Sequence, residues 1–488
     1  MPTILGANTL STGYDVENSL KFNDGDTPNL VRTISSGADM TKFTFSFWCK
    51  RCTLGGDQRI YSNENTTAKQ IYIRFNNNNT FTVYHQGGGS DVLSFDTNAI
   101  FRDTTGWYHF HFLMDSTQGT ESDRFKMHVN GQQITSFNSP VYPSSNEAAA
   151  FLNTNEKTNI GFRDASAGGG QHFDGYLAET VLLQGVAEPY TTFGEFDEDS
   201  PNIWKPKKLS GLTFGTNGFY LEYKQTVTSA NSSGIGADTS GNDNHLTPSN
   251  LAATDVTTDT CTNNYAILNP LTIPNGASLT LAEGNLTIGG NQTDAGAKAT
   301  FGVSSGKWYW EIKAVVASGG SDRLLVATEN VRQITSATDP SSEGIWGIQS
   351  RSGTGATLNS FTNGTFSNGN SGSTGFNDNT IIGVALDADN GKLYFHKDGT
   401  YTDLSGNTGN PADGTNPTFT GLPTDGTFLF PYVENRPNGT PSSQVNFGGA
   451  PSFAISSGNS DANGYGNFEH SVPSGYYALN TKNIAEFG

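Results

Sequence analysis

At 488 residues the chain is too long for one hydrophobic core and long enough for two or three domains. Its formal net charge of −19 argues against nucleic acid as a partner, because binding phosphates requires clustered Lys and Arg side chains. With 58 Gly residues and 11 % aromatic residues, the composition indicates a folded chain with frequent turns and argues against a disordered one.

Residues 1–195 predict a series of β-strands with almost no helix. Short runs that alternate apolar and polar residues are typical of strands with one buried face. Breaks rich in Asn or Gly mark the loops between them. The expected strands are 19–22, 43–49, 71–75, 81–84 and 107–115.

One pattern occurs twice, at 107–131 and at 381–399. In each copy two alternating runs flank an aspartate-led break, and the second run ends in a dipeptide that supplies the positive φ angles of a tight hairpin. These dipeptides are Asn130-Gly131 and Asp398-Gly399. Alternation places one apolar set on a single strand face: Tyr108, Phe110, Phe112 and Met114. The fold class predicted for both halves of the chain is therefore all-β, as antiparallel β-sandwiches.

Three stretches in the first part of the chain carry a family likeness: 43–48, then 107–109 with 125–131, and the closing strand 173–183. In this order they resemble the laminin G-like, concanavalin A-like lectin sandwich. The resemblance implies a lectin-type antiparallel sandwich at 1–195. It is specific for the fold and weak for activity.

Residues 196–270 change in character. An acidic run at 196–201 leads into a stretch rich in Asn, Ser and Thr, which indicates a connector with short strands rather than a core. The pieces 219–223 and 238–245 look like parts of another lectin-like sandwich. Packing on a neighbour is therefore an open alternative to a free linker.

Residues 271–488 contain a second set of matching stretches. They are 306–312, 344–347, 382–399, 430–433 and 445–448. In order and spacing they resemble a SPRY domain, a different antiparallel sandwich used for binding. The resemblance implies a module that recognises protein segments through its loops.

The whole arrangement carries a further likeness. A lectin-type sandwich, a connector, a SPRY module and the closing stretch 475–483 are similar in order to the virion structural proteins of aquatic tailed bacteriophages, and so is the start at 18–26 with 30–33. The resemblance implies a bacteriophage virion structural protein of the tail-fibre or decoration type. It does not identify the virion part.

Candidate catalytic groups are few. Glu195, Asp197 and Asp199 alternate as a glycosidase acid and nucleophile do, but they abut Pro201 at a domain end, where an acidic linker is the simpler interpretation. Ser304 stands in a Gly-x-Ser-x-Gly pattern, yet a strand follows it instead of the helix that a nucleophile elbow requires. We therefore expect no enzyme activity and no catalytic residue.

Candidate metal ligands include three histidines. His109 and His111 share one strand face and His128 lies on the partner strand, so three imidazoles could hold zinc. Because the opposite face carries the aromatic core, we favour the alternative that these side chains belong to a solvated outer face.

Other possible ligands are cysteines and loop aspartates. Cys49 and Cys52 form a C-x-x-C without a second pair and Cys261 stands alone, so buried thiols are favoured over a redox or zinc site. A structural calcium ion is the alternative considered for four aspartates, although turns also select this residue. They are Asp24, Asp26, Asp387 and Asp389.

The leading hypothesis is a non-enzymatic tail-fibre or receptor-binding component that contacts host surface glycan. Aromatic loop residues beside amides and hydroxyls can stack on sugars. The candidates are Tyr84, Phe361, Phe366 and Tyr401. The alternatives are a capsid decoration or tail cement protein that binds other virion proteins and, less favoured, a glycan-degrading enzyme.

The remaining expectations concern location and assembly. The N-terminus lacks the basic start and apolar core of a signal peptide, and no apolar run approaches the roughly 20 residues that cross a bilayer. We therefore expect no membrane insertion and a protein assembled into virions in the host cytoplasm. The chain has no heptads, so a homo-oligomer, trimeric if it forms a fibre, would be held by sandwich surfaces.

Overall fold

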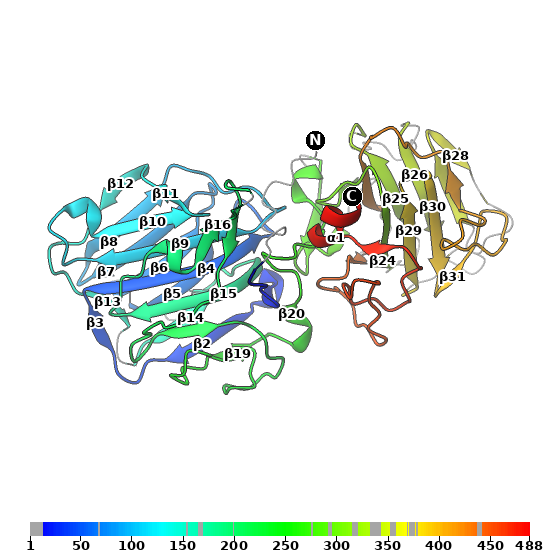
Figure 1. Ribbon diagram of the computed structural model, residues 1–488. Coiled ribbons are helices and arrows are strands. Elements are labelled where there is room, and N and C mark those ends of the chain that lie inside the picture. The colour runs from blue at the N-terminus through cyan, green and yellow to red at the C-terminus, as the bar shows by residue number, and fades with distance from the viewer. Residues whose placement is uncertain are drawn as a thin grey trace. The chain divides into compact units, whose positions relative to one another are not determined.

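The computed structural model describes residues 13–66, 69–152, 155–163, 169–198, 200–274, 277–290, 295–314, 321–331, 343–351, 358–367, 369, 376, 379–436 and 442–488. The chain divides into two compact units, unit 1 up to Asn263 and unit 2 from Asn264. Both are antiparallel β-sandwiches, which confirms the predicted all-β fold class (Figure 1).

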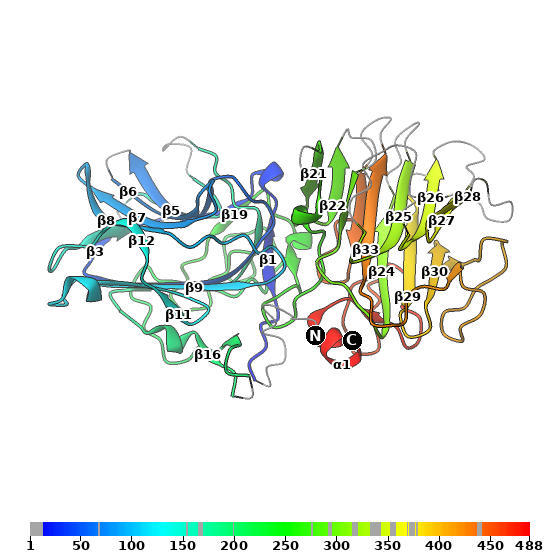
Figure 2. The same ribbon diagram turned by 90° about the horizontal axis from the view of Figure 1, so that it is seen from above.

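Unit 1 contains two eight-stranded sheets, one above the other in Figure 2. Sheet 1 runs β11 (Gln132–Ile134), β10 (Phe125–Val129), β9 (Tyr108–Asp115), β4 (Lys42–Arg51), β15 (Gly175–Gln184), β1 (Ser19–Phe22) and β20 (Val256–Thr257), with β18 (Phe219–Leu221) also on β15. Sheet 2 runs β12 (Phe137–Val141), β8 (Ser90–Thr97), β7 (Phe81–Gly87), β6 (Lys69–Phe75), β5 (Gln58–Thr66), β14 (Lys157–Ile160), β2 (Asn29–Thr33) and β19 (Thr247–Ser249). Two small ribbons pair β3 (Ala38–Met40) with β13 (Ala149–Leu152) and β16 (Gly194–Phe196) with β17 (Trp204–Pro206).

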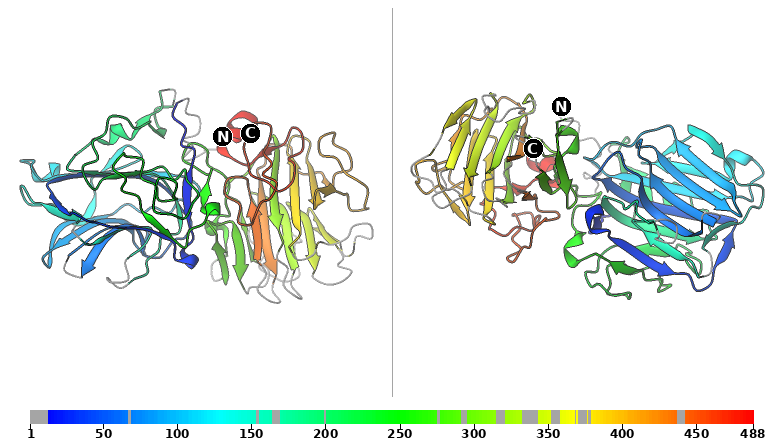
Figure 3. Two further views of the ribbon diagram at one scale, coloured as in Figure 1. Left: turned by 90° about the horizontal axis from the view of Figure 1, so that it is seen from below. Right: turned by 180° about the vertical axis from the view of Figure 1, so that it is seen from behind.

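Unit 2 contains two further sheets, which Figure 3 shows from below and from behind. Sheet 3 runs β21 (Leu279–Ala282), β22 (Thr287–Gly290), β34 (Ser442–Asn446), β24 (Lys307–Lys313), β29 (Ile381–Asp387), β30 (Lys392–Lys397) and β31 (Thr400–Tyr401), with β32 (Phe419–Thr420) and β35 (Tyr477–Ala478) beside it. Sheet 4 runs β23 (Ala295–Lys298), β33 (Leu429–Arg436), β25 (Ser321–Thr328), β26 (Ile345–Arg351), β27 (Leu358–Thr362) and β28 (Thr365–Ser367).

Helix is scarce in the described parts of the chain. An α-helix, α1, spans Thr481–Phe487, and its N-terminus is capped by Asn480, whose side chain accepts a hydrogen bond from the amide of Asn483. Short 3-10 turns occupy η2 (Asp24–Asp26), η3 (Glu121–Asp123), η5 (Tyr190–Thr192), η6 (Ala253–Asp255) and η7 (Pro270–Thr272). Among the described residues, no helix has the length and apolar character needed to span a membrane.

The core of unit 1 is an aromatic layer between sheets 1 and 2. The alternating face predicted from the sequence lies in it, because Phe110, Phe112 and Met114 are all fully buried. Phe81 of sheet 2 stacks on Phe110 of sheet 1 with ring centroids 4.3 Å apart. Such stacked pairs add to the hydrophobic stabilisation of the buried area.

The two predicted tight turns are present. Asn130 and Gly131 have φ values of 48° and 76°, and Asp398 and Gly399 have values of 47° and 85°. Two successive positive φ angles match the twist of the flanking strands in a type I′ hairpin. The turns join β10 to β11 in unit 1 and β30 to β31 in unit 2.

The expected connector at 196–270 is divided differently in the structure. Residues up to Asn263 belong to unit 1, where β18 pairs with β15, β19 with β2 and β20 with β1. The polar composition of this stretch hid these pairings, because short strands at sheet edges need only a few buried residues. Unit 2 begins seven residues before the expected start at 271.

Candidate functional site

The outer face of sheet 1 is covered by residues 186–198 and 200–214, here named the covering segment. The segment follows β15 and carries the β16–β17 ribbon, which Figure 2 shows on the side of β9 away from sheet 2. Phe193 packs on Val181 and Leu183 of β15. Trp204 is buried, and its indole Nε1 donates to His109 Nδ1 over 3.0 Å.

The three histidines lie beneath this segment, so the expectation of a solvated face is wrong. His109, His111 and His128 are 1 %, 0 % and 6 % exposed. His111 Nδ1 is 3.4 Å from His128 Nδ1, and His111 Nε2 lies 3.0 Å from the carbonyl oxygen of Glu188 in the covering segment. The alternation of the strand was interpreted correctly, but it cannot reveal that a later segment returns over the polar side.

The buried histidines are held in their neutral form. Burial lowers the pKa of His111 to about 3 and that of His128 to about 4; the nearness of His128 adds to the effect on His111, and the charge of Lys126 adds to the effect on His128. In the residues that the structure describes, no group of three or more His, Cys, Asp or Glu side chains is arranged to hold a metal ion. The imidazoles instead bind the covering segment through hydrogen bonds and stacking, such as that of His128 on Tyr190 at 4.3 Å.

A buried carboxyl group lies on the same covered face. Glu179 occupies a β-bulge in β15 with φ of 48°, and its carboxylate accepts hydrogen bonds from the hydroxyls of Tyr14 and Tyr220. Burial raises its pKa to about 7. The adjacent cavity holds only about 10 Å³, room for about one water molecule and too little for a sugar ring.

The predicted catalytic candidates are not assembled into a site. Glu195 and Asp197 lie in and after β16, where Lys205 approaches them at 3.8 Å and 3.2 Å, and Asp199 lies outside the described residues. These carboxylates therefore belong to the covering ribbon rather than to a free linker. Ser304 precedes β24, a strand, as its sequence context predicted.

The other candidate ligands have structural surroundings. Cys49, Cys52 and Cys261 are buried thiols, and burial raises the pKa of each. Asp387 accepts a bond from the amide of Asn390 and pairs with Lys307 at 3.1 Å. The remaining aspartates lie in turns: Asp24 and Asp26 in η2, and Asp389, which accepts from the amide of Gly306.

The outer face of sheet 2 carries a pair of accessible tyrosines. Tyr72 on β6 and Tyr84 on β7 are directly opposite each other, because they alternate with the buried residues Ile71, Ile73 and Val83. Both are half-buried, and their rings stack at 4.9 Å. Sequence reasoning proposed Tyr84 but missed Tyr72, although the same alternation predicts both.

Hydrogen-bonding groups surround this pair. We name the outward side chains of β6, β7 and β8 the Tyr84 face; it includes Gln70, Tyr72, Arg74, Thr82, Tyr84, Gln86, Asp91, Ser94 and Asp96. Tyr84 donates its hydroxyl to Asp91 over 2.5 Å, and Gln70 donates to Gln86 over 3.2 Å. The face thus combines aromatic area with carboxylates and amides.

On the β5 side, Arg59 and Gln171 bound the Tyr84 face. The guanidinium carbon of Arg59 lies 3.7 Å from the centre of the Tyr72 ring, and Arg59 Nε donates to Gln171 Oε1 over 2.6 Å. Ser62 and Asn159, farther along the same row of strands, are fully buried. A ligand can therefore approach over β6–β8.

Of the four aromatic residues proposed from the sequence, none lies in a loop. Tyr84 and Phe366 are accessible, on β7 and β28. Phe361 on β27 is 1 % exposed, and Tyr401 on β31 packs against a buried cluster. The expectation that they lie in loops is therefore wrong; Tyr84, for example, is in the middle of β7, whose first residues were predicted as a strand.

Comparison with known families matches both units. Residues 23–189 match the Concanavalin A-like lectin/glucanases superfamily, and residues 307–450 match the SPRY domain. The chain contains a lectin-like domain and a SPRY domain. The lectin-like domain includes the Tyr84 face on sheet 2. It also includes sheet 1, whose outer face the covering segment buries.

Solved structures and curated proteins add little beyond the fold. The SPRY domain of human HERC1 is 17 % identical, with a TM-score of 0.26, covering 36 % of this chain and 96 % of that one. A heptameric SAP-like pentraxin from Limulus polyphemus is 13 % identical, with a TM-score of 0.27, covering 36 % and 80 %. At these scores neither carries an argument about function. No curated protein matches this chain significantly.

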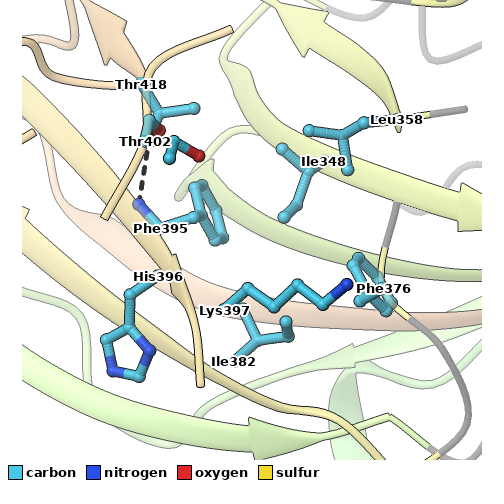
Figure 4. A pocket seen from close by; sticks show the side chains of 9 residues that line it. All are labelled: Ile348, Leu358, Phe376, Ile382, Phe395, His396, Lys397, Thr402 and Thr418. Atoms are coloured by element: carbon cyan, nitrogen blue, oxygen red, sulfur yellow. Dashed lines mark hydrogen bonds between the residues drawn. The ribbon is translucent and has the colours of Figure 1, made fainter. Parts of the chain in front are cut away.

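The SPRY domain has a small pocket with walls from both of its sheets (Figure 4). Apolar side chains form most of its lining, among them Ile348, Ile382 and Phe395. The Phe395 amide donates to Thr418 Oγ1 over 3.0 Å. Its volume of about 30 Å³ admits about two water molecules, so it is too small for a sugar ring.

Proposed function

We propose that this chain is a non-enzymatic structural protein of a bacteriophage virion, a tail-fibre or receptor-binding component that recognises a host surface glycan. The order of its sandwiches, which is similar to that of virion proteins of aquatic tailed phages, supports the virion assignment. The lectin-like domain supports binding to glycan. We place that binding on the Tyr84 face.

The half-buried ring of Tyr84, which Tyr72 supports from one side, carries the proposal. Tyrosine rings offer flat apolar area at low entropic cost, and a few polar groups around them fix the orientation of a ligand. Asp91 and Asp96 can accept hydrogen bonds from sugar hydroxyls, and Gln86 can both donate and accept. On the opposite face, the described part of the covering segment buries the polar row of β9 and β10 that includes the three histidines.

Binding to host cells and to isolated envelope glycan tests this proposal. Purified full-length protein should bind both, and Tyr84→Ala should weaken binding at least tenfold because it removes the stacking surface. Phe366→Ala, which truncates an exposed aromatic residue of the SPRY domain, is the matched control and should leave binding unchanged. Absence of binding by the unsubstituted protein to every host glycan fraction would overturn the proposal.

The second candidate function is capsid decoration or tail cement, in which the chain binds other virion proteins. The pocket of Figure 4 favours it, because its volume suits the tip of an apolar side chain and not a sugar. Immunogold labelling of particles separates the two functions. Label confined to tail fibres supports receptor binding, and label over the whole capsid supports decoration.

Assembly is part of the proposal. We propose a homo-oligomer, a trimer if the protein forms a fibre, with its contacts made by sandwich surfaces. Light scattering of the purified protein at several concentrations measures this directly. A purified protein that stays monomeric at every concentration would contradict a homo-oligomer held by its own sandwich surfaces.

A further inference from the structure

We infer that the Tyr84 face selects neutral saccharides over their acidic counterparts. The inference rests on the proposed glycan binding and specifies the substrate class of that same site. It depends on three features: the carboxylates on the face, the engagement of its guanidinium groups, and the position of the free acceptor atoms.

The first feature is the excess of carboxylate on the open part of the face. Strands β6–β8 present two carboxylates, Asp91 and Asp96, beside the tyrosine pair. Among the described outward side chains of these strands, Arg74 carries the positive charge. The whole chain carries a formal net charge of −19. A ligand carboxylate would approach two like charges, and such a juxtaposition is a common means of rejecting a wrong partner.

The second feature is that neither guanidinium group of this region is open to a ligand anion, because Arg74 pairs with Asp57 and Arg59 is 2 % exposed. Arg74 Nη1 donates to Asp57 Oδ2 over 2.8 Å, and its guanidinium carbon lies 5.1 Å from the centre of the Tyr72 ring. Arg59 lies over the same ring and donates to Gln171. To pair with Arg74, a ligand carboxylate would have to compete with Asp57, and Arg59 is buried and so out of its reach.

The third feature is a carboxylate oriented by its neighbours. Asp96 accepts hydrogen bonds from Asn76 Nδ2 at 3.0 Å, Thr80 Oγ1 at 2.8 Å and Thr82 Oγ1 at 3.2 Å. All three hydrogen bonds end on Asp96 Oδ1. None of the described residues donates a hydrogen bond to Asp96 Oδ2. A fixed anionic acceptor forms a strong hydrogen bond with a hydroxyl donor. Neutral sugars carry several such donors on one ring.

These features together define the ligand. A neutral pyranose can lie against the ring of Tyr84 and donate hydroxyls to Asp96 and Asp91. Its uronic counterpart keeps the ring and the stacking but replaces one hydroxymethyl group by a carboxylate. The two ligands then differ in charge and in one hydroxyl donor, and both differences make the acidic ligand the poorer one for a face that carries carboxylate acceptors.

Matched ligand pairs test the inference on the full-length protein. Methyl glucoside is compared with methyl glucuronide, and methyl galactoside with methyl galacturonide, by ligand-observed NMR titration at low ionic strength. At least one neutral member should bind at least tenfold more tightly than its acidic partner, and the ratio should shrink at high salt because salt screens surface charge.

Two variants locate the selectivity. Asp96→Asn keeps the shape of the side chain and removes its charge, so it should weaken the neutral ligand and bring the neutral-to-acidic ratio closer to one. Tyr84→Ala should weaken both members of a pair alike. Equal or tighter binding of the acidic member by the unsubstituted protein would overturn the neutral preference while leaving glycan binding intact. Binding of no glycoside and no host glycan would overturn the proposed function as well.

Discussion

The two outer faces of the lectin-like domain have the same alternating sequence pattern, but the face of sheet 1 is buried and the Tyr84 face of sheet 2 is partly exposed. Each strand alternates core residues with polar or aromatic ones, so His109 and His111 on sheet 1 and Tyr72 and Tyr84 on sheet 2 are equivalent by periodicity. The covering segment returns over sheet 1 and buries its histidines in neutral form. The Tyr84 face of sheet 2 stays open, which is why we propose it as the surface that recognises a ligand.

Truncating Trp204, at the centre of the covering segment, should have the largest effect on the stability of the domain. Trp204 is 3 % exposed, and its ring lies 5.9 Å from that of His109 and 5.6 Å from that of Tyr190. Trp204→Ala should lower the free energy of unfolding of the lectin-like domain by about 3–5 kcal/mol, the usual cost of removing a buried aromatic residue. Urea unfolding followed by far-ultraviolet circular dichroism measures it. A loss below about 1 kcal/mol would show that the cover contributes little.

The covered face should also make the domain sensitive to acid. His128 has a folded-state pKa of about 4, below its ordinary value of 6.5, because it is buried and Lys126 is near. The neutral form is favoured by folding, so stability is present above pH 6.5 and is lost as the pH falls toward 4. The loss from this one group approaches about 1.4 kcal/mol per pH unit, or roughly 3 kcal/mol in all.

His128→Gln isolates that contribution. The variant cannot gain a proton at this position, so its urea midpoint should fall less steeply between pH 6.5 and 4 than that of the unsubstituted protein. His470→Gln, in the SPRY domain, is the control and should leave the pH profile of the lectin-like domain unchanged. Parallel profiles for His128→Gln and the unsubstituted protein would contradict the burial argument.

Alternation and turn chemistry were sufficient to predict the sandwiches, because both are local. Phe110 and Phe112 alternate into the core, and Asn130-Gly131 forms the expected turn. The cover was not predictable in the same way. Its contacts join residues far apart in sequence, such as Trp204 and His109, and no periodicity specifies them. The Tyr84 face was predicted in part, since aromatic content pointed to Tyr84 but not to the row that includes Tyr72.

The twin hairpin turns offer a smaller and more local comparison of the two units. A Cβ on Gly131 would lie 2.3 Å from Trp204 of the cover, whereas a Cβ on Gly399 would meet nothing closer than His470 Nδ1 at 3.3 Å. Both residues have positive φ, which costs about 1 kcal/mol for a side chain. Gly131→Ala should therefore cost about 2–3 kcal/mol, with the overlap added, and Gly399→Ala about 1 kcal/mol. If the two variants lost the same free energy of unfolding in urea, the β16–β17 ribbon would have moved away from the new methyl group at no energetic cost.

Tyr84→Ala should have the smallest effect on folding, and this is what makes it informative. The side chain lies on an uncovered strand face, so its truncation removes one stacking contact with Tyr72 and one hydrogen bond to Asp91. Surface changes of this kind stay within about 0.5–1 kcal/mol. A variant that unfolds like the unsubstituted protein but no longer binds glycan would separate recognition from stability. Trp204→Ala should show the reverse under conditions where the domain remains folded, because that residue contacts the opposite sheet and leaves the Tyr84 face intact.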